Sequence, residues 1–508
     1  MHLPLTLGTL SAALLPLTLS AQKADRPNVI LLVADDLGYG DLSCYGAERV
    51  STPHTDGLAR TGIRFTDVHA VAATSTPSRF SLLTGEYAWR KKGREVASGD
   101  AAMIIEPDCF TLADLFKSLG YATAAVGKWH LGLGSVTGAQ DWNAPLPQAL
   151  GDIGFDYSYI MAATADRVPA VFIENGSVAN YDPSAPIEVD YRKPFPGEPT
   201  GKDNPELLYN LKSSHGHDQA IVNGIGRIGY MKGGGTALWK DENIADSIAV
   251  HATRFIEKHA GEPFFLYLAT NDIHVPRFPH ERFRGRSPMG LRGEAILQFD
   301  WTVGQVLSKL EELGIRDNTL IILTSDNGPV IDDGYQDGAR ELLGGHRPSG
   351  PLRGFKYSAY EGGTAVPFIV SWPAVVRSRG TSGALLSQVD LMRSLGSLLG
   401  ARFPRGSAPD SRDFHEALLG KDGEGAPFVI ESSNTLSIRD RKWKYIAPGG
   451  GGPMITWGPE IETGYRPYPQ LFDLSDKREA ENRIEAHRAE YLRLRDLLER
   501  VVDGRYLQ

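Results

Sequence analysis

Four apolar segments of the chain end in the same way, with ionisable residues directly after the last apolar position. They span residues 28–36, 121–130, 263–274 and 319–328. Their apolar runs are unbroken rather than alternating, which is typical of strands buried on both faces of a parallel sheet. Helical patterns lie between them, as at residues 109–120, which Gly120 would cap, and 296–314. The alternation predicts an α/β fold in which helices sandwich a large, mostly parallel sheet.

The pattern changes in two further regions. Residues 140–236 have weak periodicity and many turn residues, which indicates an elaborated insertion over the functional site. Residues 428–447 resemble a β-hairpin, and apolar positions at helical spacing predict a closing helix from about residue 479 to 502. We therefore predict a main domain over residues 22–406 and a smaller α+β subdomain with an antiparallel sheet over residues 407–508.

Residues 1–21 predict a signal peptide. The segment is mostly apolar and closes with two small residues. The alternative is a membrane anchor, which is disfavoured because a glycine and two prolines interrupt a run that is short for a span. No other segment is long and apolar enough to cross a bilayer, so we expect an exported protein that is not integral to the membrane.

Charge and cysteine content narrow the function classes. The chain has 508 residues and a formal net charge of -9. This balance argues against a general nucleic-acid binder, which usually carries a basic patch or a high pI. Two cysteines, Cys44 and Cys109, could form one disulfide, and the sequence leaves their pairing open.

The predicted strand ends carry a set of oxygen ligands. Substrates and cofactors of α/β proteins bind beyond the carboxyl ends of the parallel strands. We therefore expect four side chains at these ends to lie together: Asp35, Asp36, Asp326 and Asn327. Carboxylate and amide oxygens suit calcium or magnesium, whereas no Cys/His cluster has the spacing usual for zinc. Adjacent aspartates would repel one another without a cation, so a divalent metal accounts for the pair.

Five cationic side chains accompany these acids near strand ends and turns. They are Arg79, Lys128, His130, His274 and Lys356. Such a set opposite a metal suits a tetrahedral anion, either sulfate or phosphate, with charge stabilisation as the main catalytic device.

The stretch TSTPSRFSLLTG, residues 74–85, combines a helix start with a candidate nucleophile. Pro77 fits the first turn of a helix with Thr76 as its N-cap. Ser75 would then lie just outside the helix N-terminus, where backbone N–H groups favour an anion. The pattern GxSxG does not surround Ser75, so the stretch is not a hydrolase nucleophile elbow.

These residues carry a resemblance to a known family. SxPSRxxLLTG, beginning at Ser75, resembles the signature of the type I, formylglycine-dependent sulfatases of the alkaline phosphatase superfamily, and GKWHLG at residues 127–132 is similar to their second signature. VADDLGYGD, TSDNG and LRGFKYSAYEGG follow in the family's order, and LFDLSDKREAENRI at residues 471–484 resembles its closing segment. The main domain is accordingly expected to be the catalytic sulfatase domain.

The resemblance implies a role for each matching position. Residue 75 would be oxidised from serine to Cα-formylglycine, as in bacterial enzymes matured by a radical-SAM enzyme before export to the periplasm or the outside. The implied ligands of one calcium ion are Asp35, Asp36, Ser75, Asp326 and Asn327. Arg79 would stabilise the modified side chain, His130 would act as a base, Lys128 and Lys356 would bind sulfate, and His274 would bind sulfate and protonate the leaving alcohol.

The substrate is narrowed by resemblance alone. The stretches 216–242, 326–339 and 344–354 resemble secreted bacterial carbohydrate sulfatases, including those acting on galactose or N-acetylgalactosamine sulfates. Three alternatives stay open: an arylsulfatase with another substrate, a phosphatase or phosphonate hydrolase on the same scaffold, and a sulfated-glycan binder with unmodified Ser75. Candidate sugar-binding residues are His215, His217, Arg277, Asp332, Asp333 and His346.

Overall fold

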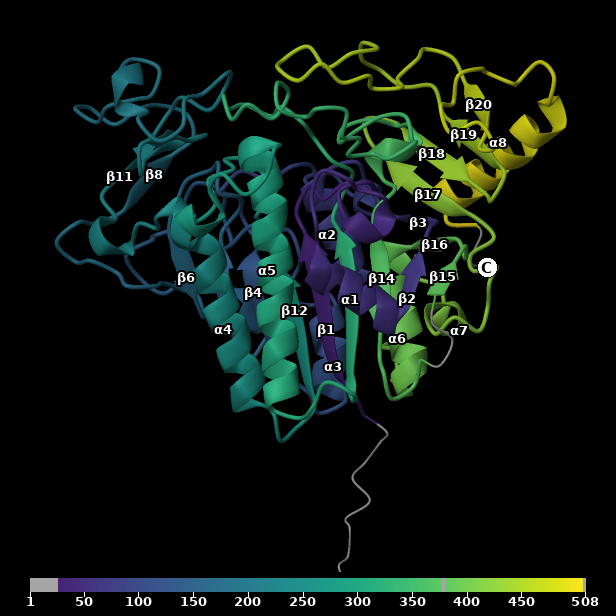
Figure 1. The fold of residues 1–508 in the computed structure, drawn as a ribbon, viewed down its shortest axis with the longest axis horizontal. Helices are drawn as coiled ribbons and strands as arrows, with labels where there is room; N and C mark the ends of the chain where they lie inside the picture. Colours follow the sequence, from purple (N-terminus) through teal and green to yellow (C-terminus); the bar gives the residue numbers. More distant parts are fainter. Residues whose placement is uncertain (1–25, 377–379, 506–508) are drawn as a thin grey trace, which may run out of the picture.

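The computed structural model describes residues 26–376 and 380–505, so the predicted signal peptide lies outside the described residues. Its central element is a ten-stranded sheet in the order β15-β2-β14-β13-β1-β12-β4-β5-β6-β7 (Figure 1). The strands are β1 (Asn28–Ala34), β2 (Ile63–Phe65), β4 (Ala122–Lys128), β5 (Tyr157–Met161), β6 (Phe172–Glu174), β7 (Ser177–Val178), β12 (Phe264–Ala269), β13 (Thr319–Ser325), β14 (Phe368–Ser371) and β15 (Gly380–Ser382).

The middle of this sheet is parallel, as the unbroken apolar runs predict. β13, β1, β12, β4 and β5 pair parallel to one another, whereas β14 on one side and β6 on the other pair antiparallel to their neighbours. The four predicted strands are β1, β4, β12 and β13, so the α/β expectation with a mostly parallel sheet is confirmed. Their carboxyl ends lie at one edge, at the top of Figure 1.

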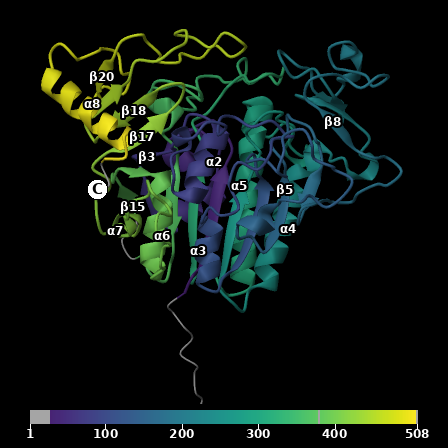
Figure 2. The ribbon, with the colours of Figure 1, turned by 180° about the vertical axis from the view of Figure 1, so that it is seen from behind.

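Helices cover both faces of the sheet (Figures 1 and 2). On one face lie α1 (Pro53–Thr61), α4 (Ile244–Lys258) and α5 (Gly290–Glu312), and on the other lie α2 (Ser75–Thr84), α3 (Leu112–Ser118) and α6 (Leu391–Leu399). α3 begins with a capping box between its N-cap Thr111 and Asp114, and α5 begins six residues before the predicted start at Ile296. The short α7 (His415–Leu418) packs on α6.

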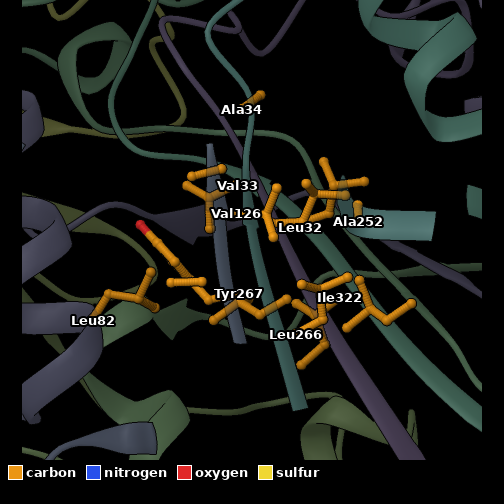
Figure 3. Close-up of a cluster of buried hydrophobic side chains, with 14 of the residues drawn as sticks. Leu32, Val33, Ala34, Leu82, Val126, Ala252, Leu266, Tyr267 and Ile322 are labelled. Atoms are coloured by element: carbon orange, nitrogen blue, oxygen red, sulfur yellow. The ribbon is translucent and has the colours of Figure 1, made fainter. Parts of the chain in front are cut away.

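The core lies between the sheet and these helices. Figure 3 shows part of it, with Leu32 of β1, Val126 of β4, Leu266 of β12 and Ile322 of β13 among the labelled side chains. All four are at most 2% exposed. Because burial of a large aliphatic side chain contributes on the order of 1.5–3 kcal/mol, this layer holds the strand ends rigidly in place.

Two additional units lie above the carboxyl edge of the sheet. The first is the predicted insertion, which contains short strands and appears at the upper left of Figure 1. Its paired strands are β8 (Glu188–Asp190) with β11 (Tyr230–Lys232) and β9 (Ile221–Val222) with β10 (Ile225–Gly226). Another short pair, β3 (Val68–His69) with β16 (Leu386–Ser387), lies near the second unit.

The second unit is a small antiparallel sheet near the C-terminus. It consists of β17 (Val429–Ser432), β18 (Leu436–Arg439), β19 (Trp443–Ile446) and β20 (Gln470–Asp473), with α8 (Arg488–Val502) packed on β18 and β19. The predicted hairpin is thus part of a longer meander. Its separate core includes Phe428, whereas Ala408 and Ala417 pack in the main core, and the division at residue 406 stays a prediction.

The closing helix begins later than predicted, at Arg488 rather than near residue 479. Glu479 is 1% exposed and has a φ of 46°, which is incompatible with a right-handed helix. Its Oε2 accepts a hydrogen bond from the backbone N–H of Glu361 at 2.8 Å. This long-range contact therefore overrides the local helical pattern.

Buried charges join the small sheet to the main domain. Lys444 Nζ lies 3.0 Å from Glu361 Oε1 and 2.6 Å from Glu431 Oε2. Arg439 Nη1 lies 2.5 Å from Glu361 Oε2 and 2.9 Å from Asp67 Oδ1. Since removal of one partner would leave an uncompensated buried charge, these pairs fix how the small sheet sits on the main domain.

Two further sequence questions are answered by the fold. Cys44 and Cys109 are both free thiols, so they do not form the disulfide that the sequence left open. Within residues 26–376 and 380–505, none of the helices combines the length and the apolar character needed to traverse a bilayer.

The first prediction concerns the pH dependence of stability. Burial, with the nearby Glu361 carboxylate adding to it, raises the pKa of Glu479 from its ordinary 4.5 to about 8. The folded chain therefore keeps a proton that the unfolded chain loses, so this stabilisation is fully present below pH 4.5 and is lost as the pH rises to about 8. We expect Glu479→Gln to remove a decline of up to about 1.4 kcal/mol per pH unit in that window.

Urea unfolding of both proteins at pH 5.5, 7 and 8 measures this difference. The exposed Glu485→Gln, which lies outside the buried cluster, is the matched control and should keep the wild-type slope. Parallel stability curves for wild type and Glu479→Gln would contradict the assignment.

Candidate active site

Polar side chains from four strands meet at the carboxyl edge of the sheet, as predicted. Asp35 and Asp36 follow β1, His130 follows β4, His274 follows β12 and Asp326 follows β13. All five are at most 4% exposed. Residues far apart in the sequence therefore form one buried polar group on the strand ends.

Ser75 lies within this group. Its Oγ donates a hydrogen bond to Asp326 Oδ2 at 2.6 Å and accepts one from Arg79 Nε at 3.0 Å. Arg79 Nη2 pairs with Asp326 Oδ2 at 2.9 Å, and Arg79 Nη1 donates to the hydroxyl of Tyr267 on β12 at 3.0 Å. Burial alone would raise the pKa of Asp326, but Arg79 and Lys128 outweigh burial and hold that pKa below its usual range.

The helix that carries Ser75 begins two residues earlier than predicted. Its N-cap is Thr74, so Ser75 lies in the first turn of α2 rather than just outside it. Thr76 does not cap the helix, because its Oγ1 donates to the carbonyl of His130 at 3.0 Å and accepts from the N–H of Ala97 at 3.1 Å. Pro77 fits the third position equally well, since first-turn N–H groups have no intrahelical partner.

Lys128 and Asp35 form a fully buried pair. Lys128 Nζ lies 2.6 Å from Asp35 Oδ1 and 3.5 Å from Asp326 Oδ2. Burial raises the pKa of Asp35 against the opposing charge of Lys128, and burial lowers the pKa of Lys128 against the charge of Asp35. Both pKa shifts would become smaller if a cation bound beside Asp35 and an anion bound beside Lys128. Each bound ion would favour the charged form of the residue next to it.

Lys356 forms the corresponding pair with Asp36. Lys356 Nζ lies 2.9 Å from Asp36 Oδ2 and 3.1 Å from Asp333 Oδ2. Burial alone would lower the pKa of Lys356, but Asp36 outweighs it and raises that pKa well above its usual value. Asn327 Nδ2 donates to Asp36 Oδ1 at 2.7 Å, which orients the amide oxygen away from Asp36.

The oxygen ligands fit a divalent cation. Asp35 Oδ2 and Asn327 Oδ1 are buried without a hydrogen-bond partner among the described residues. Buried acceptors that lack a donor are costly, and a hard cation would satisfy both. Asp35, Asp36 and His274 also have ligand atoms within 4.8 Å of one another. The residues present thus match an oxygen-liganded metal, with the histidine available at its margin.

The two histidines expose different ring nitrogens. His130 Nε2 lies 2.9 Å from the carbonyl of Ala97, and its Nδ1 has no partner among the described residues. Burial, together with the charge of Lys128, lowers the pKa of His130 well below its usual value. A neutral ring that donates through Nε2 leaves Nδ1 as a proton acceptor. His274 instead uses Nδ1 toward the carbonyl of Val275 at 2.7 Å, and its Nε2 lies 3.9 Å from Asp36 Oδ2.

A cavity of about 100 Å³ opens above these groups. Its lining includes Ser75 of α2, His130 and His274 from the segments after β4 and β12, and Lys356 from a glycine-rich turn. His217 and Asp333, two of the six candidate sugar ligands, also line it.

The other four candidate sugar ligands lie outside this cavity. Arg277 Nη1 forms a buried ion pair with Asp337 at 2.6 Å, and His346 Nε2 makes a buried contact with Asp41 Oδ1 at 2.7 Å, so both side chains are already engaged. His215 lies beside Trp457, with ring centroids 6.5 Å apart, and Asp332 lines a separate small pocket.

Sequence reasoning missed four charged or aromatic residues of the lining. Asp166 and Arg167 follow β5, and they repeat the signal of the other strand ends, so the pattern could have found them. Tyr357 is next to the predicted Lys356 and has a left-handed φ of 74°. Trp457 comes from the C-terminal part of the chain, and no local pattern marks it as a site residue.

The metal fit gives the second prediction. Calcium added to chelator-treated protein should raise the melting temperature by a few degrees, because a ligand that binds only the folded chain stabilises it. Asp35→Asn should abolish this calcium-dependent shift, whereas Asp332→Asn, outside the oxygen cluster, should keep it. A shift that is absent in wild type, or equal in both variants, would contradict a cation site at Asp35.

Comparisons with known proteins agree with this geometry. A family profile described as Sulfatase matches residues 27–401. An N-acetylgalactosamine-6-O-sulfatase of Bacteroides thetaiotaomicron is 51% identical over 485 residues, covering 95% of this chain and 94% of that protein. Human steryl-sulfatase is 30% identical over 420 residues, covering 78% of this chain and 70% of that protein.

The fold comparison gives the same result. A structure solved in work on the metabolism of multiple glycosaminoglycans by Bacteroides thetaiotaomicron matches with a TM-score of 0.92 and 51% identity, covering 94% of this chain and 100% of that one. The resemblance of the signatures is therefore confirmed over nearly the whole length. The chain belongs to the sulfatase family of sulfuric ester hydrolases and has that family's alkaline-phosphatase-like fold.

Proposed function

We propose that this chain hydrolyses the 6-O-sulfate ester of N-acetylgalactosamine in a glycan. The observation that carries the proposal is Ser75, held by Arg79 and Asp326 at the strand ends, in a chain 51% identical to an N-acetylgalactosamine-6-O-sulfatase. Galactose sulfate, the alternative substrate, would be hydrolysed by the same chemistry. Only the protein groups that surround the sugar would distinguish the two substrates. A phosphatase with two zinc ions is disfavoured, because His274 is the one histidine that lies with Asp35 and Asp36 in the candidate metal cluster of the described residues.

The cofactor ligands follow from the unpartnered oxygens and the Ser75 contacts. Asp35, Asp36, residue 75, Asp326 and Asn327 would hold one Ca²⁺ ion. The ion would supply positive charge, and a Cα-formylglycine at residue 75 would supply a hydrated aldehyde as a nucleophile stronger than a serine hydroxyl. Arg79 would hold that side chain in place, because it already contacts the Oγ position at 3.0 Å.

The lysines are suited to bind the sulfate group. Lys128 lies 3.5 Å from the Asp326 carboxylate that holds Ser75, and Lys356, which pairs with Asp36, lines the cavity together with Ser75. Four carboxylates, Asp35, Asp36, Asp326 and Asp333, face three cations, Arg79, Lys128 and Lys356, so this set has an excess of one negative charge. A divalent ion would make it positive, which favours a sulfate ester and the charge that develops as its bond to the alcohol breaks.

The two histidines have complementary proton roles. His130 would accept a proton from residue 75 when sulfate is released, since its Nδ1 is unpartnered and its lowered pKa keeps the ring neutral. His274 would protonate the leaving sugar oxygen from Nε2, because this residue lines the cavity and its Nδ1 is already used by the carbonyl of Val275. Such general acid catalysis contributes about 10²–10⁴-fold when the leaving group is a poor one.

The sugar would be held by residues of the insertion and of the loop that follows β13. His217 and Asp333 line the cavity, and His217 Nε2 lies 3.0 Å from Asp166, which fixes its ring. Buried polar groups of this kind reject sugars that lack the matching hydroxyl or amide. Arg277, His215, Asp332 and His346 would act indirectly, by supporting the surrounding loops.

Biological context completes the proposal. Residues 1–21 would direct export to the bacterial periplasm or the outside, after a radical-SAM maturation enzyme has converted Ser75 in the cytoplasm. Exposure of the sulfated glycan outside the cell would make an exported enzyme necessary.

The third prediction tests the reaction. Protein co-expressed with a maturation enzyme should release sulfate from N-acetylgalactosamine 6-sulfate, and Ser75→Ala should lower kcat at least about 10³-fold while leaving the melting temperature near wild type. Ser118→Ala, exposed at the end of α3, is the matched control and should retain full activity. A preference for aryl phosphate over aryl sulfate, or turnover by Ser75→Ala, would overturn the proposal.

The fourth prediction separates the acid role of His274 from simple binding. His274→Ala should lower kcat/KM for the sugar sulfate about tenfold or more beyond its effect on an activated aryl sulfate, whose leaving group needs no proton. His259→Ala, near the far end of α4, should affect neither substrate. Equal losses on both substrates would exclude His274 as the acid.

A further inference from the structure

The catalytic cavity adjoins a second and larger cleft. The two share Thr74, Val96, Tyr357 and Trp457 in their linings. The cleft has a volume of about 560 Å³, whereas the cavity has about 100 Å³. Pockets that bind small organic ligands usually measure about 300–1,000 Å³. The cleft, and not the cavity alone, therefore has room for a sugar ring beside the one that carries the sulfate.

Two distant parts of the chain form its walls. Residues 88–96, which follow α2, supply one wall, and residues 432–436 with Ile455, Trp457 and Tyr465 of the C-terminal part supply the other. The wall residues of this cleft, here called the flanking cleft, are used by none of the catalytic roles above. The C-terminal part would thus contribute to substrate recognition as well as to stability.

The first wall is positively charged. Lys91 and Lys92 are both exposed there. Lys91 has only a loose ion pair with Glu106 at 3.5 Å, and Lys92 has no ion pair within the part of the chain that the structure describes. Arg94 is buried and engaged by Glu86 at 3.2 Å, while Glu95 is the single acid that lines the cleft. The two lysines are consequently available for an anion.

The cleft also offers aromatic surface and unpartnered polar atoms. Trp457 is 54% exposed and stands edge-on to Tyr357, with ring centroids 5.2 Å apart. Trp89 Nε1 and Ser433 Oγ are buried without a hydrogen-bond partner among the described residues. An amphipathic ring can cover the C–H face of a sugar, and orphaned polar atoms are satisfied by a polar ligand.

We propose that the flanking cleft binds the sugar next to the sulfated residue and prefers a sugar that carries an anionic group, a carboxylate or a second sulfate. Lys92 and Lys91 would pair with that anionic group. Trp457 would cover the ring of the sugar bound in the flanking cleft, between the anionic group and the sulfate. This inference rests on the proposed function, since it concerns the same substrate chain. It makes the enzyme selective for acidic glycans over the isolated sulfated sugar.

The test compares kcat/KM for N-acetylgalactosamine 6-sulfate with kcat/KM for its disaccharides. In these disaccharides, the second sugar is a uronic acid, a second sulfated sugar or a neutral hexose, attached on either side of N-acetylgalactosamine 6-sulfate. An acidic disaccharide should exceed the monosaccharide and the neutral disaccharide by about tenfold or more, and Lys92→Ala should lower that ratio by a similar factor. Lys258→Ala, exposed at the far end of α4, is the matched control and should leave the ratio unchanged.

The outcomes are distinguishable from failure of the proposed function. Turnover of the monosaccharide with ratios near one for every disaccharide, or an unchanged ratio in Lys92→Ala, would overturn the inference alone. If no sulfate is released from any substrate, calorimetry measures binding of the acidic disaccharides to the Ser75→Ala chain instead. Adding Lys92→Ala to that chain should weaken the binding about tenfold, and unchanged binding would overturn the inference. A preference confined to the uronic acid or to the second sulfate identifies which anion the lysines recognise.

Discussion

Three buried carboxylates at adjacent strand ends impose the main constraint on this structure. Asp35, Asp36 and Asp326 are at most 1% exposed, and such charges are tolerated in the interior only when they are paired. Each has a cation, Lys128, Lys356 and Arg79 respectively. The position of Ser75 follows from this arrangement, because Arg79 and Asp326 contact both each other and its Oγ.

The rest of the fold keeps that arrangement rigid and covered. The parallel strands align the carboxylates, and the hydroxyl of Tyr267, within the core itself, ties Arg79 to β12. The insertion and the small sheet then rise on either side of the sheet edge (Figure 1). The buried pairs of Glu361 with Lys444 and Arg439 hold the small sheet against the main domain, so its loops can complete a cleft beside the site.

Much of this organisation is predictable from sequence, for a physical reason. Strands buried on both faces must be apolar, so an abrupt change to Asp, His or Lys marks the sheet edge where ligands bind. Local sequence patterns cannot predict how contacts between residues far apart in the sequence change the role of a single side chain. Thr76 is used by His130 and Ala97 instead of capping α2, and Glu479 is buried under Glu361 instead of starting α8. Trp457 reaches the cavity only because the small sheet packs where it does.

The central claim is that Ser75 is the precursor of the catalytic group, and the mass of one peptide tests it most directly. Trypsin releases residues 65–79, which contain Ser75 and end at Arg79. In protein from a host that supplies the maturation enzyme, the account predicts a loss of about 2 Da, the two hydrogens removed to form the aldehyde, located by fragmentation at residue 75. A peptide of unaltered mass in protein that nevertheless releases sulfate would contradict it.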